Sequence, residues 1–212
     1  LEAGNGGAAS IYAGQRGAQG GVLLSLSARD DRGFDQSGDG GGKDGTNRKT
    51  ISLSGDFAAT PDLRFGTVLR RSVERFDFDD ENFLATTADD YIRDADNTGR
   101  TDEFQGALWA ELDGAGGRLT QRLELQQTIV KQSRNDGPVT RGETQALKYR
   151  ASIGLDGTVD SARNLLNILA EYQRDENSDA PGRSRAMSSA ALEYRASPWD
   201  GLDLQAGLRH DA

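Results

Sequence analysis

The amino-acid sequence predicts an all-β fold, an antiparallel up-and-down transmembrane β-barrel of which the chain supplies a fragment of about ten strands. Three observations support this prediction. Apolar and polar residues alternate with a period of two from one end of the chain to the other, which is typical of strands with two unlike faces. Most alternating runs are near the roughly 9–11 residues that a tilted strand needs to cross a bilayer. Short and long connections also follow one another in turn, as in outer-membrane barrels.

The clearest hairpin spans residues 49–72. Its turn, residues 58–62, contains Pro61, whose fixed φ favours a change of direction, and Asp62, which can bond its own backbone. We expect one face of this hairpin to meet lipid and the other to meet a water-filled lumen, with residues 58–62 as a periplasmic turn. The lipid-facing residues are then Ile51, Leu53, Phe57, Leu63, Phe65 and Leu69, and the lumen-facing residues are Thr50, Ser52, Ser54, Arg64 and Arg70.

The same alternation recurs along the rest of the chain. In order, the runs cover residues 9–14, 22–29, 104–112, 119–129, 147–156, 166–173, 190–195 and 202–209. Charged residues on the polar faces are expected to project into the lumen and to pair across neighbouring strands, among them Arg122, Glu124, Lys148 and Glu171.

The connections between these runs fall into two classes. The short ones cover residues 17–20, 58–62, 113–117, 158–162 and 197–201. The longer ones are rich in Asp, Gly, Asn, Ser and Arg, as exposed loops are, and cover residues 30–48, 74–100, 132–143 and 175–185. A soluble β-sandwich has no reason to alternate the two classes, whereas an outer-membrane barrel does. Strand length and loop alternation together therefore favour the barrel over a soluble antiparallel sheet with one wet face.

The composition argues against several classes of function. A net charge of −9 argues against a nucleic-acid partner, because binding phosphates needs an excess of basic side chains. Cysteine is absent, which excludes disulfides and thiolate metal sites. His210 is the only histidine, and no catalytic constellation or nucleotide-binding glycine motif is present, so we expect no enzyme activity. The chain begins at Leu1 without an initiator Met and stops directly after a strand-like run, which indicates a piece of a longer protein.

Three adjoining segments resemble TonB-dependent outer-membrane receptors of the cobalamin-receptor-like branch. They are residues 31–35 (DRGFD), residues 38–45 (GDGGGKDG) and residues 49–55 (KTISLSG), which follow that branch's strand, acidic glycine-rich loop and next strand. Residues 62–65 (DLRF) and 76–79 (FDFD) resemble its next turn and loop. The sequence departs from the pattern at Arg32-Gly33-Phe34, where "DGF" is commoner. As a pattern of strands and loops, the resemblance extends over nearly all 212 residues.

The resemblance implies a barrel of about 22 strands with a plugged lumen, of which residues 1–212 form part of the barrel domain. The plug domain and the C-terminal strands are then absent from this chain. Such receptors lie in the outer membrane of Gram-negative cells and import a large, scarce nutrient, cobalamin or a ferric siderophore, with energy delivered by TonB through the plug. Two other functions stay open, a passive porin or adhesin-type barrel and a soluble β-rich binding module.

Acidic residues gather in the first two long loops. Carboxylates on such loops suit Ca²⁺, a hard cation that takes about six to eight oxygen ligands. Some cobalamin receptors order their early loops with calcium, so the resemblance makes Asp39 and Asp44 the candidate ligands, although a solvated acidic loop is the simpler interpretation. The candidate contacts for the imported ligand are Asp31, Phe34, Asp35, Asp79 and Asp80. No cofactor is required by these expectations.

Overall fold

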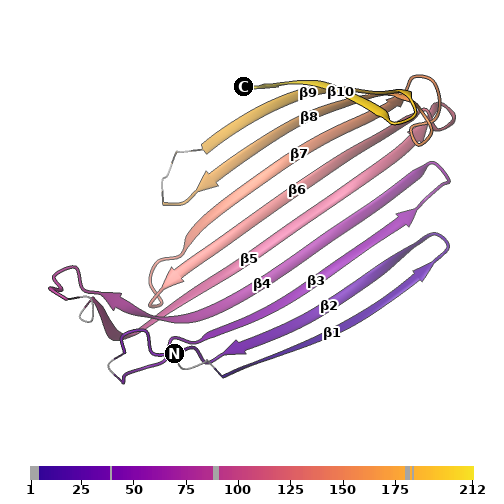
Figure 1. Cartoon of the computed structure of the whole chain (residues 1–212). Coiled ribbons are helices and arrows are strands. Elements are labelled where there is room, and N and C mark those ends of the chain that lie inside the picture. Colours follow the sequence, from indigo (N-terminus) through magenta and orange to yellow (C-terminus); the bar gives the residue numbers. More distant parts are fainter. Residues whose placement is uncertain (1–4, 39, 88–90, 180–181, 183) are drawn as a thin grey trace.

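The computed structural model describes residues 5–38, 40–87, 91–179, 182 and 184–212, and they form one antiparallel sheet (Figure 1). Each strand pairs with its neighbours in the sequence, in the order β1-β2-β3-β4-β5-β6-β7-β8-β9-β10. The strands are β1 (Gly6–Gly17), β2 (Gly20–Asp31), β3 (Thr46–Ala58), β4 (Leu63–Glu81), β5 (Ile92–Gly114), β6 (Leu119–Arg134), β7 (Thr140–Gly154), β8 (Asn164–Asn177), β9 (Ser184–Trp199) and β10 (Leu202–Asp211). A short 3₁₀ turn, η1 (Ala115–Gly117), joins β5 to β6. The predicted all-β, up-and-down topology of ten strands is confirmed.

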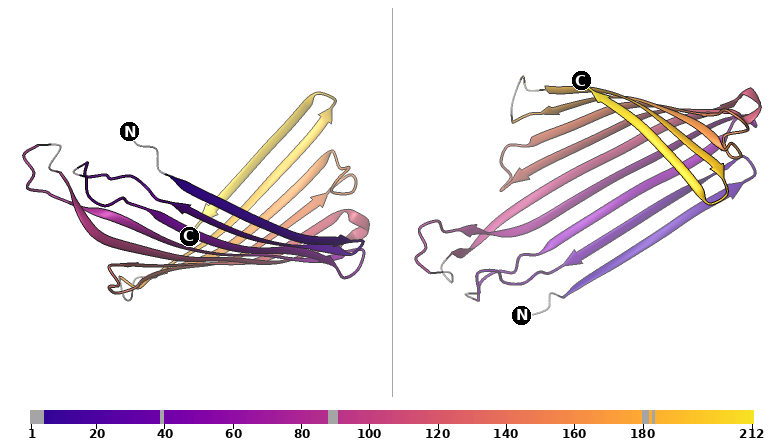
Figure 2. Two further views of the ribbon diagram at one scale, coloured as in Figure 1. Left: turned by 90° about the horizontal axis from the view of Figure 1, so that it is seen from below. Right: turned by 45° about the horizontal axis from the view of Figure 1, so that its top comes forward.

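The sheet curves as a section of a barrel wall does, with β1 and β10 at its two free edges (Figure 2). Twist between neighbouring strands, summed over a sheet this wide, produces such curvature. No helix among the described residues is long and apolar enough to span a membrane.

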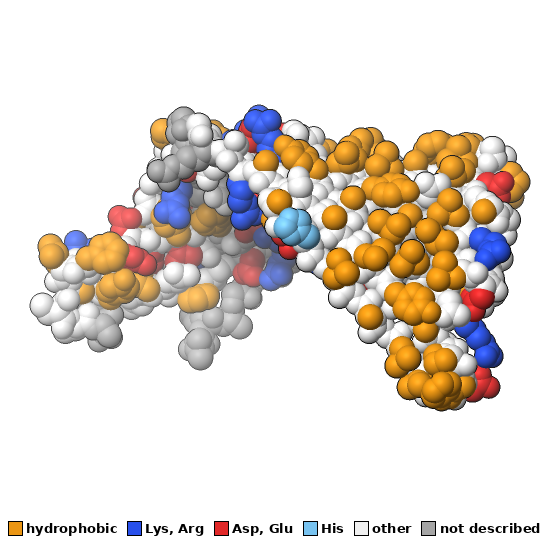
Figure 3. Space-filling model, turned by 90° about the horizontal axis from the view of Figure 1, so that it is seen from above, with side chains coloured by type: hydrophobic (Ala, Val, Ile, Leu, Met, Phe, Trp, Pro, Cys, Tyr) orange, Lys and Arg blue, Asp and Glu red, His pale blue; other side chains and the backbone are white. Residues whose placement is uncertain are grey.

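The register places the predicted apolar residues of the first hairpin on one face. Leu24, Leu53 and Leu69 lie opposite one another across β2, β3 and β4, and Phe57 pairs with Phe65 beside the turn. Because side chains alternate between faces along a strand, the rest of the apolar set shares this face, and Thr50, Ser52 and Arg70 share the other. We call them the outer face and the inner face. Hydrophobic side chains gather in a broad patch on the molecule seen from above (Figure 3).

The sheet has almost no core of its own. Among the described residues, the buried ones are Ser72, Gly99, Ala146, Ala151, Gly154 and Ser189, and no large side chain is fully buried. Large apolar side chains of the outer face remain exposed instead, for example 47% of Ile51 and 54% of Leu125. No second layer among the described residues covers this face, so the apolar pattern does not arise from packing between two sheets.

The structure corrects the predicted lengths of strands and loops. β4 and β5 continue far past the apolar band, so most of the predicted loop 74–100 is strand and only residues 82–91 connect the two. The backbone ladder continues there because pairing needs no apolar side chains; Arg75 pairs with Arg100 and Phe76 with Gly99. Loop alternation is correspondingly only partly confirmed. Residues 155–163 between β7 and β8 form a longer connection than residues 135–139 between β6 and β7.

The turn of the first hairpin forms at the predicted place, but its side-chain hydrogen bonds come from Thr60 and not from Asp62. The Thr60 hydroxyl accepts hydrogen bonds from the backbone N–H groups of Leu63 at 3.0 Å and Asp62 at 3.3 Å. The Asp62 carbonyl accepts a bond from the Asp113 N–H at 2.8 Å, which ties this turn to the next one. Thr60 therefore plays the role that the sequence assigned to the Asp62 side chain.

Candidate functional site: the loop end and the polar inner face

The connections lie at two ends of the sheet. We call the end that carries residues 32–45, 82–91, 135–139 and 178–183 the loop end, and the opposite end the turn end. At the loop end, residues 32–45 lie against the extended β4–β5 hairpin. The Gly45 carbonyl accepts a hydrogen bond from the Asp77 N–H at 2.9 Å, and the Gly42 N–H donates to the Asp94 carboxylate at 2.6 Å. The first loop and the ends of β4 and β5, which are far apart from it in the sequence, thus form one surface.

The first predicted ligand contacts are used to shape their own loop. The Asp35 carboxylate accepts hydrogen bonds from the Ser37 hydroxyl (2.7 Å) and from the N–H groups of Gly38 (2.7 Å) and Gly40 (2.9 Å). These bonds, the one from Ser37 foremost, hold the pKa of Asp35 below its usual value of 3.8. Asp31 likewise accepts a bond from the Gly33 N–H at 3.1 Å. The geometry gives both carboxylates a structural role, and their contact with a ligand stays a prediction.

Four carboxylates come together where the first loop meets the β4–β5 hairpin. Burial raises the pKa of Asp44, and the negative charges of Asp79, Asp77 and Asp94 raise it further. One carboxylate oxygen of Asp44 and one of Asp79 are buried without a hydrogen-bond partner among the described residues. The structure therefore brings two predicted residues, Asp44 and Asp79, into one cluster. It adds Asp94, whose place opposite the first loop no sequence pattern indicated.

These carboxylates do not form a ready calcium site. Among the described residues, no three acidic or imidazole side chains are placed to hold a metal ion. Asp39, the other predicted ligand, lies outside the described residues. The Asp80 carboxylate makes a different contact, in which it accepts a hydrogen bond from the Asn97 amide at 2.7 Å. Calcium binding by Asp39 and Asp44 stays a prediction.

Exposed apolar side chains stand on the same surface. Phe34 is 49% exposed, and on the neighbouring loop Phe83 is 79% exposed and Leu84 is 90% exposed. The rings of Phe83 and Tyr91 meet edge to face at 6.3 Å. Phe34 was predicted as a ligand contact, whereas the other three were not, although Phe83-Leu84 within an acidic loop was a usable signal. Ligand-binding sites commonly combine apolar and aromatic side chains with a few polar or charged groups, as this surface does.

Hydroxyl groups line the inner face of β2, β3 and β4. The hydroxyls of Ser25 and Ser52 bond across the strands at 2.7 Å, and those of Thr50 and Ser72 at 3.0 Å. Cross-strand hydroxyl pairs of this kind stabilise a sheet while leaving its surface polar. The predicted polar face is confirmed here, with Thr50 and Ser52 on it.

Charged pairs continue this polar surface over β5 to β8. The Arg122 guanidinium lies 4.2 Å from the ring centre of Trp109 and 2.9 Å from the Glu124 carboxylate. The ammonium group of Lys148 lies 3.3 Å from the carboxylate of Glu171 on the next strand. The predicted cross-strand pairing is confirmed for Lys148 and Glu171, whereas Arg122 and Glu124 pair along one strand, β6, and Arg122 reaches across to the Glu111 carboxylate of β5 at 3.6 Å. On this inner face each of these charged groups lies beside a group of opposite charge, so the face suits contact with water or with another polar surface.

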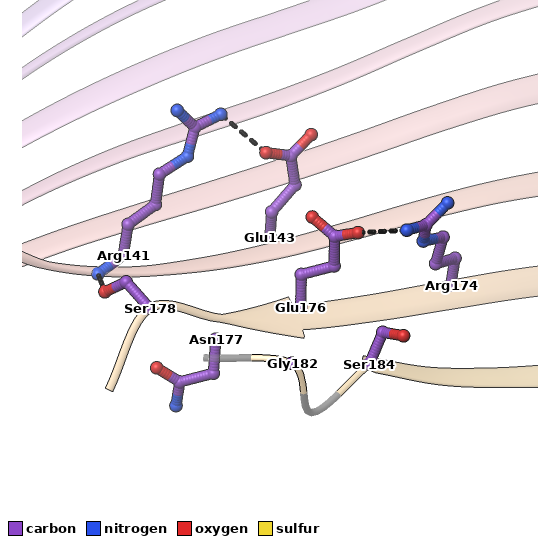
Figure 4. Close-up of a pocket in the computed structure, with 8 residues that line it drawn as sticks. All are labelled: Arg141, Glu143, Arg174, Glu176, Asn177, Ser178, Gly182 and Ser184. Atoms are coloured by element: carbon purple, nitrogen blue, oxygen red, sulfur yellow. Dashed lines mark hydrogen bonds and ion pairs between the residues drawn. The ribbon is translucent and has the colours of Figure 1, made fainter. Parts of the chain in front are cut away.

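A polar pocket marks the loop end of β7, β8 and β9 (Figure 4). Arg141 and Glu143 form an ion pair at 2.5 Å on β7, and Arg174 and Glu176 form a second at 2.5 Å on β8. The Ser178 hydroxyl accepts a hydrogen bond from the Arg141 N–H at 2.7 Å. By strand alternation these four charged side chains belong to the outer face, beyond the apolar band. The outer face is therefore apolar in the middle and charged at the loop end.

Comparison with known proteins identifies solved structures that share this fold. No protein-family model and no curated sequence matches the chain. The structure is similar to the siderophore receptor PirA from Acinetobacter baumannii, with a TM-score of 0.72 and 17% identity over 98% of the chain. It is also similar to the ferripyoverdine receptor of the outer membrane of Pseudomonas aeruginosa, with a TM-score of 0.63 and 10% identity over 100% of the chain.

The chain spans 36% and 37% of the length of those two receptors. At these identities the likeness is one of fold, and it covers the complete ten-stranded sheet. The chain therefore has the fold of an outer-membrane β-barrel wall and resembles the barrels of siderophore receptors.

Proposed function

We propose that the chain forms part of the wall of an outer-membrane receptor that binds and imports a large, scarce nutrient, a ferric siderophore or a cobalamin, with energy supplied by TonB. Its role is binding and passage, and no reaction is catalysed. The turn end faces the periplasm and the loop end faces the medium. A plug domain, outside this chain, fills the lumen and makes the contact with TonB.

One observation supports this proposal above the others. The whole sheet, from β1 to β10, matches the barrels of two siderophore receptors, although the sequences share little. Sequence drift at constant strand order is expected of a barrel wall, because the fold requires only alternating faces and paired backbones.

The outer face argues for the membrane over the soluble module. A soluble sheet buries its apolar face against a second layer, and in the described residues no such layer exists. Lipid supplies the missing contact, and the charged loop end of the outer face reaches the aqueous border. A protein that folds in water without detergent would contradict this assignment.

The loop end supplies the binding surface. Phe34 lies beside Asp44, whose N–H donates to the Phe34 carbonyl at 3.2 Å, and Phe83 and Tyr91 provide exposed rings on the neighbouring connection, so a bulky ligand with apolar and polar groups finds both kinds of contact at the loop end. Calcium, held by Asp39 and Asp44, would lower the mutual repulsion of the cluster and fix the two loops together.

Uptake by cells tests the proposal. Cells that express the full-length protein are given radiolabelled ferric siderophores or radiolabelled cobalamin, in strains with and without TonB. We expect saturable uptake of one of these compounds that is lost without TonB. Uptake that rises linearly with concentration and ignores TonB would instead identify a passive porin.

A pair of variants locates the binding surface. Phe83→Ala with Tyr91→Ala should weaken ligand binding about tenfold or more, since two exposed rings at a contact surface carry a large share of its affinity. Leu155→Ala is the matched control, because Leu155 is 47% exposed but lies at the turn end. Equal ligand binding by the double variant and the control would show that the loop-end rings do not contact the ligand.

A further inference from the structure

A shallow groove crosses the outer face of β1 to β4 near the loop end. Its floor is apolar and is formed by Ile11, Leu26, Ile51 and Val73, and its polar members on this face are Lys49 and Arg71. Ile11 pairs with Leu26, Leu26 with Ile51, and Ile51 with Arg71, so these residues form one row across four strands. An apolar floor that ends at two cations has the shape of a site for a lipid chain with an anionic head.

The positive charges at this groove exceed the negative ones. The Arg71 guanidinium holds the Asp102 carboxylate with two hydrogen bonds, at 2.7 and 3.0 Å. The Arg100 guanidinium lies 3.8 Å from the same carboxylate, so one acid serves two arginines. Lys49 has no ion pair among the described residues and is exposed. The cluster therefore has uncompensated positive charge.

Lys49 and Arg71 are placed to share one anion. Lys49 pairs with Val73, and Arg71 lies two residues from Val73 on the same face of β4. Diagonal neighbours of this kind lie about 7–8 Å apart, which long side chains can bridge to a single phosphate group. Arginine and lysine are the side chains that bind phosphate most strongly, and Asp102 already fixes the arginine in position.

Charge on the outer face is confined to one end. Along β3 to β7, the outer-face positions of the described residues from the groove's apolar row to the turn end carry only apolar, small or amide side chains, apart from Arg71, Glu143 and the hydroxyls of Thr67 and Tyr149. Cations recur at the loop end as Lys49, Arg100, Lys131 and Arg141. Only lipids of the leaflet at the loop end therefore have their phosphate head groups at the level of these cations.

We propose that this groove binds a phosphorylated lipid of the outer leaflet, with an acyl chain on Ile11, Leu26 and Ile51 and a head-group phosphate on Lys49 and Arg71. The proposal rests on the proposed function only for the membrane orientation of the sheet. The bound lipid would hold together the first strands of the chain at the surface that faces the medium.

The test uses the full-length protein, purified and delipidated in a non-ionic detergent, and diphosphorylated lipid A as the probe. Binding is followed by native mass spectrometry and by the lipid-dependent rise in melting temperature. We expect Lys49→Gln with Arg71→Gln to weaken binding about thirtyfold, as two basic residues at an anionic lipid surface contribute. Arg48→Gln with Arg70→Gln is the control, since these neighbours on the same strands point to the inner face and should change binding less than twofold.

Two further arms separate the lipid from its parts. Dephosphorylated lipid A, with the same acyl chains, should bind at least tenfold more weakly, and inorganic phosphate alone should give no saturable stabilisation. Equal losses in the two double variants, or equal binding of the dephosphorylated lipid, would overturn the proposal, as would saturation by phosphate alone. Nutrient uptake is measured separately, so a protein that binds this lipid but imports nothing would refute the proposed function and leave the lipid site standing.

Discussion

Placing arginine at Leu53 tests which face of the sheet meets lipid. Leu53 lies on the outer face, paired with Leu24 and Leu69, and Ser52 beside it lies on the inner face. From Lys49 to Phe57 the strand extends about 27 Å at about 3.4 Å per residue, or about 20 Å of membrane depth at the usual tilt. This span is close to the roughly 25 Å apolar band of an outer-membrane barrel, and Leu53 lies at its middle.

The expected cost follows from that depth. Arginine near the midplane of a barrel's lipid face costs about 2–4 kcal/mol of folding free energy. At Ser52 the new guanidinium enters the lumen, where it loses the Ser25–Ser52 hydrogen bond and faces Arg70 directly. The lost bond and the like-charge contact together amount to about 1–2 kcal/mol, so Ser52→Arg should be tolerated better than Leu53→Arg.

The assay is equilibrium unfolding of the full-length protein in phospholipid vesicles, with heat-modifiable gel migration as a second readout of assembly. We expect Leu53→Arg to lower the folding free energy clearly more than Ser52→Arg. Equal effects at the two positions, or a larger effect at Ser52, would refute the assignment of the faces. The comparison needs no knowledge of the ligand, so it tests the barrel itself.

Three further predictions concern single contacts. A Cβ at Gly66 would lie 2.1 Å from the Trp109 ring, so Gly66→Ala should cost about 1–3 kcal/mol and shift the tryptophan emission, whereas Gly142→Ala, which meets open space, should do neither. The depressed pKa of Asp35 means that its contribution to loop order is complete above pH 3.8 and is lost as the pH falls through the lower folded value; hydrogen exchange of residues 35–40 should rise there, and Asp35→Asn should show fast exchange at pH 7. The pKa of Asp44 is raised, so its effect on stability is opposite: its negative charge destabilises the folded loop, and protonation removes that cost. With a chelator present, Asp44→Asn should therefore slow proteolysis of residues 32–45 at pH 7. Faster cleavage would contradict the burial of the Asp44 charge.

The candidate site was only partly accessible to sequence reasoning. Asp44 and Asp79 were singled out as members of acidic loops, and the structure places them in one cluster. Asp94 joins that cluster through the backbone of Gly42, a contact between a strand residue of β5 and a loop residue far away in the sequence that no local pattern encodes. Asp35 was predicted to face a ligand, yet its hydrogen bonds to Ser37, Gly38 and Gly40 organise the loop, because a carboxylate among glycines readily accepts backbone N–H groups.

The sequence by itself determined the number of strands, their order and the two faces of the sheet. It could do so because strand periodicity is local: a period of two separates Leu53 from Ser52 without reference to any other strand. The tertiary structure alone decided how far the strands continue, since β4 and β5 extend by backbone pairing that is indifferent to side-chain type. It also decided which charges meet, because the register brings Lys49 and Arg71 to one groove, and register is a property of pairs of strands.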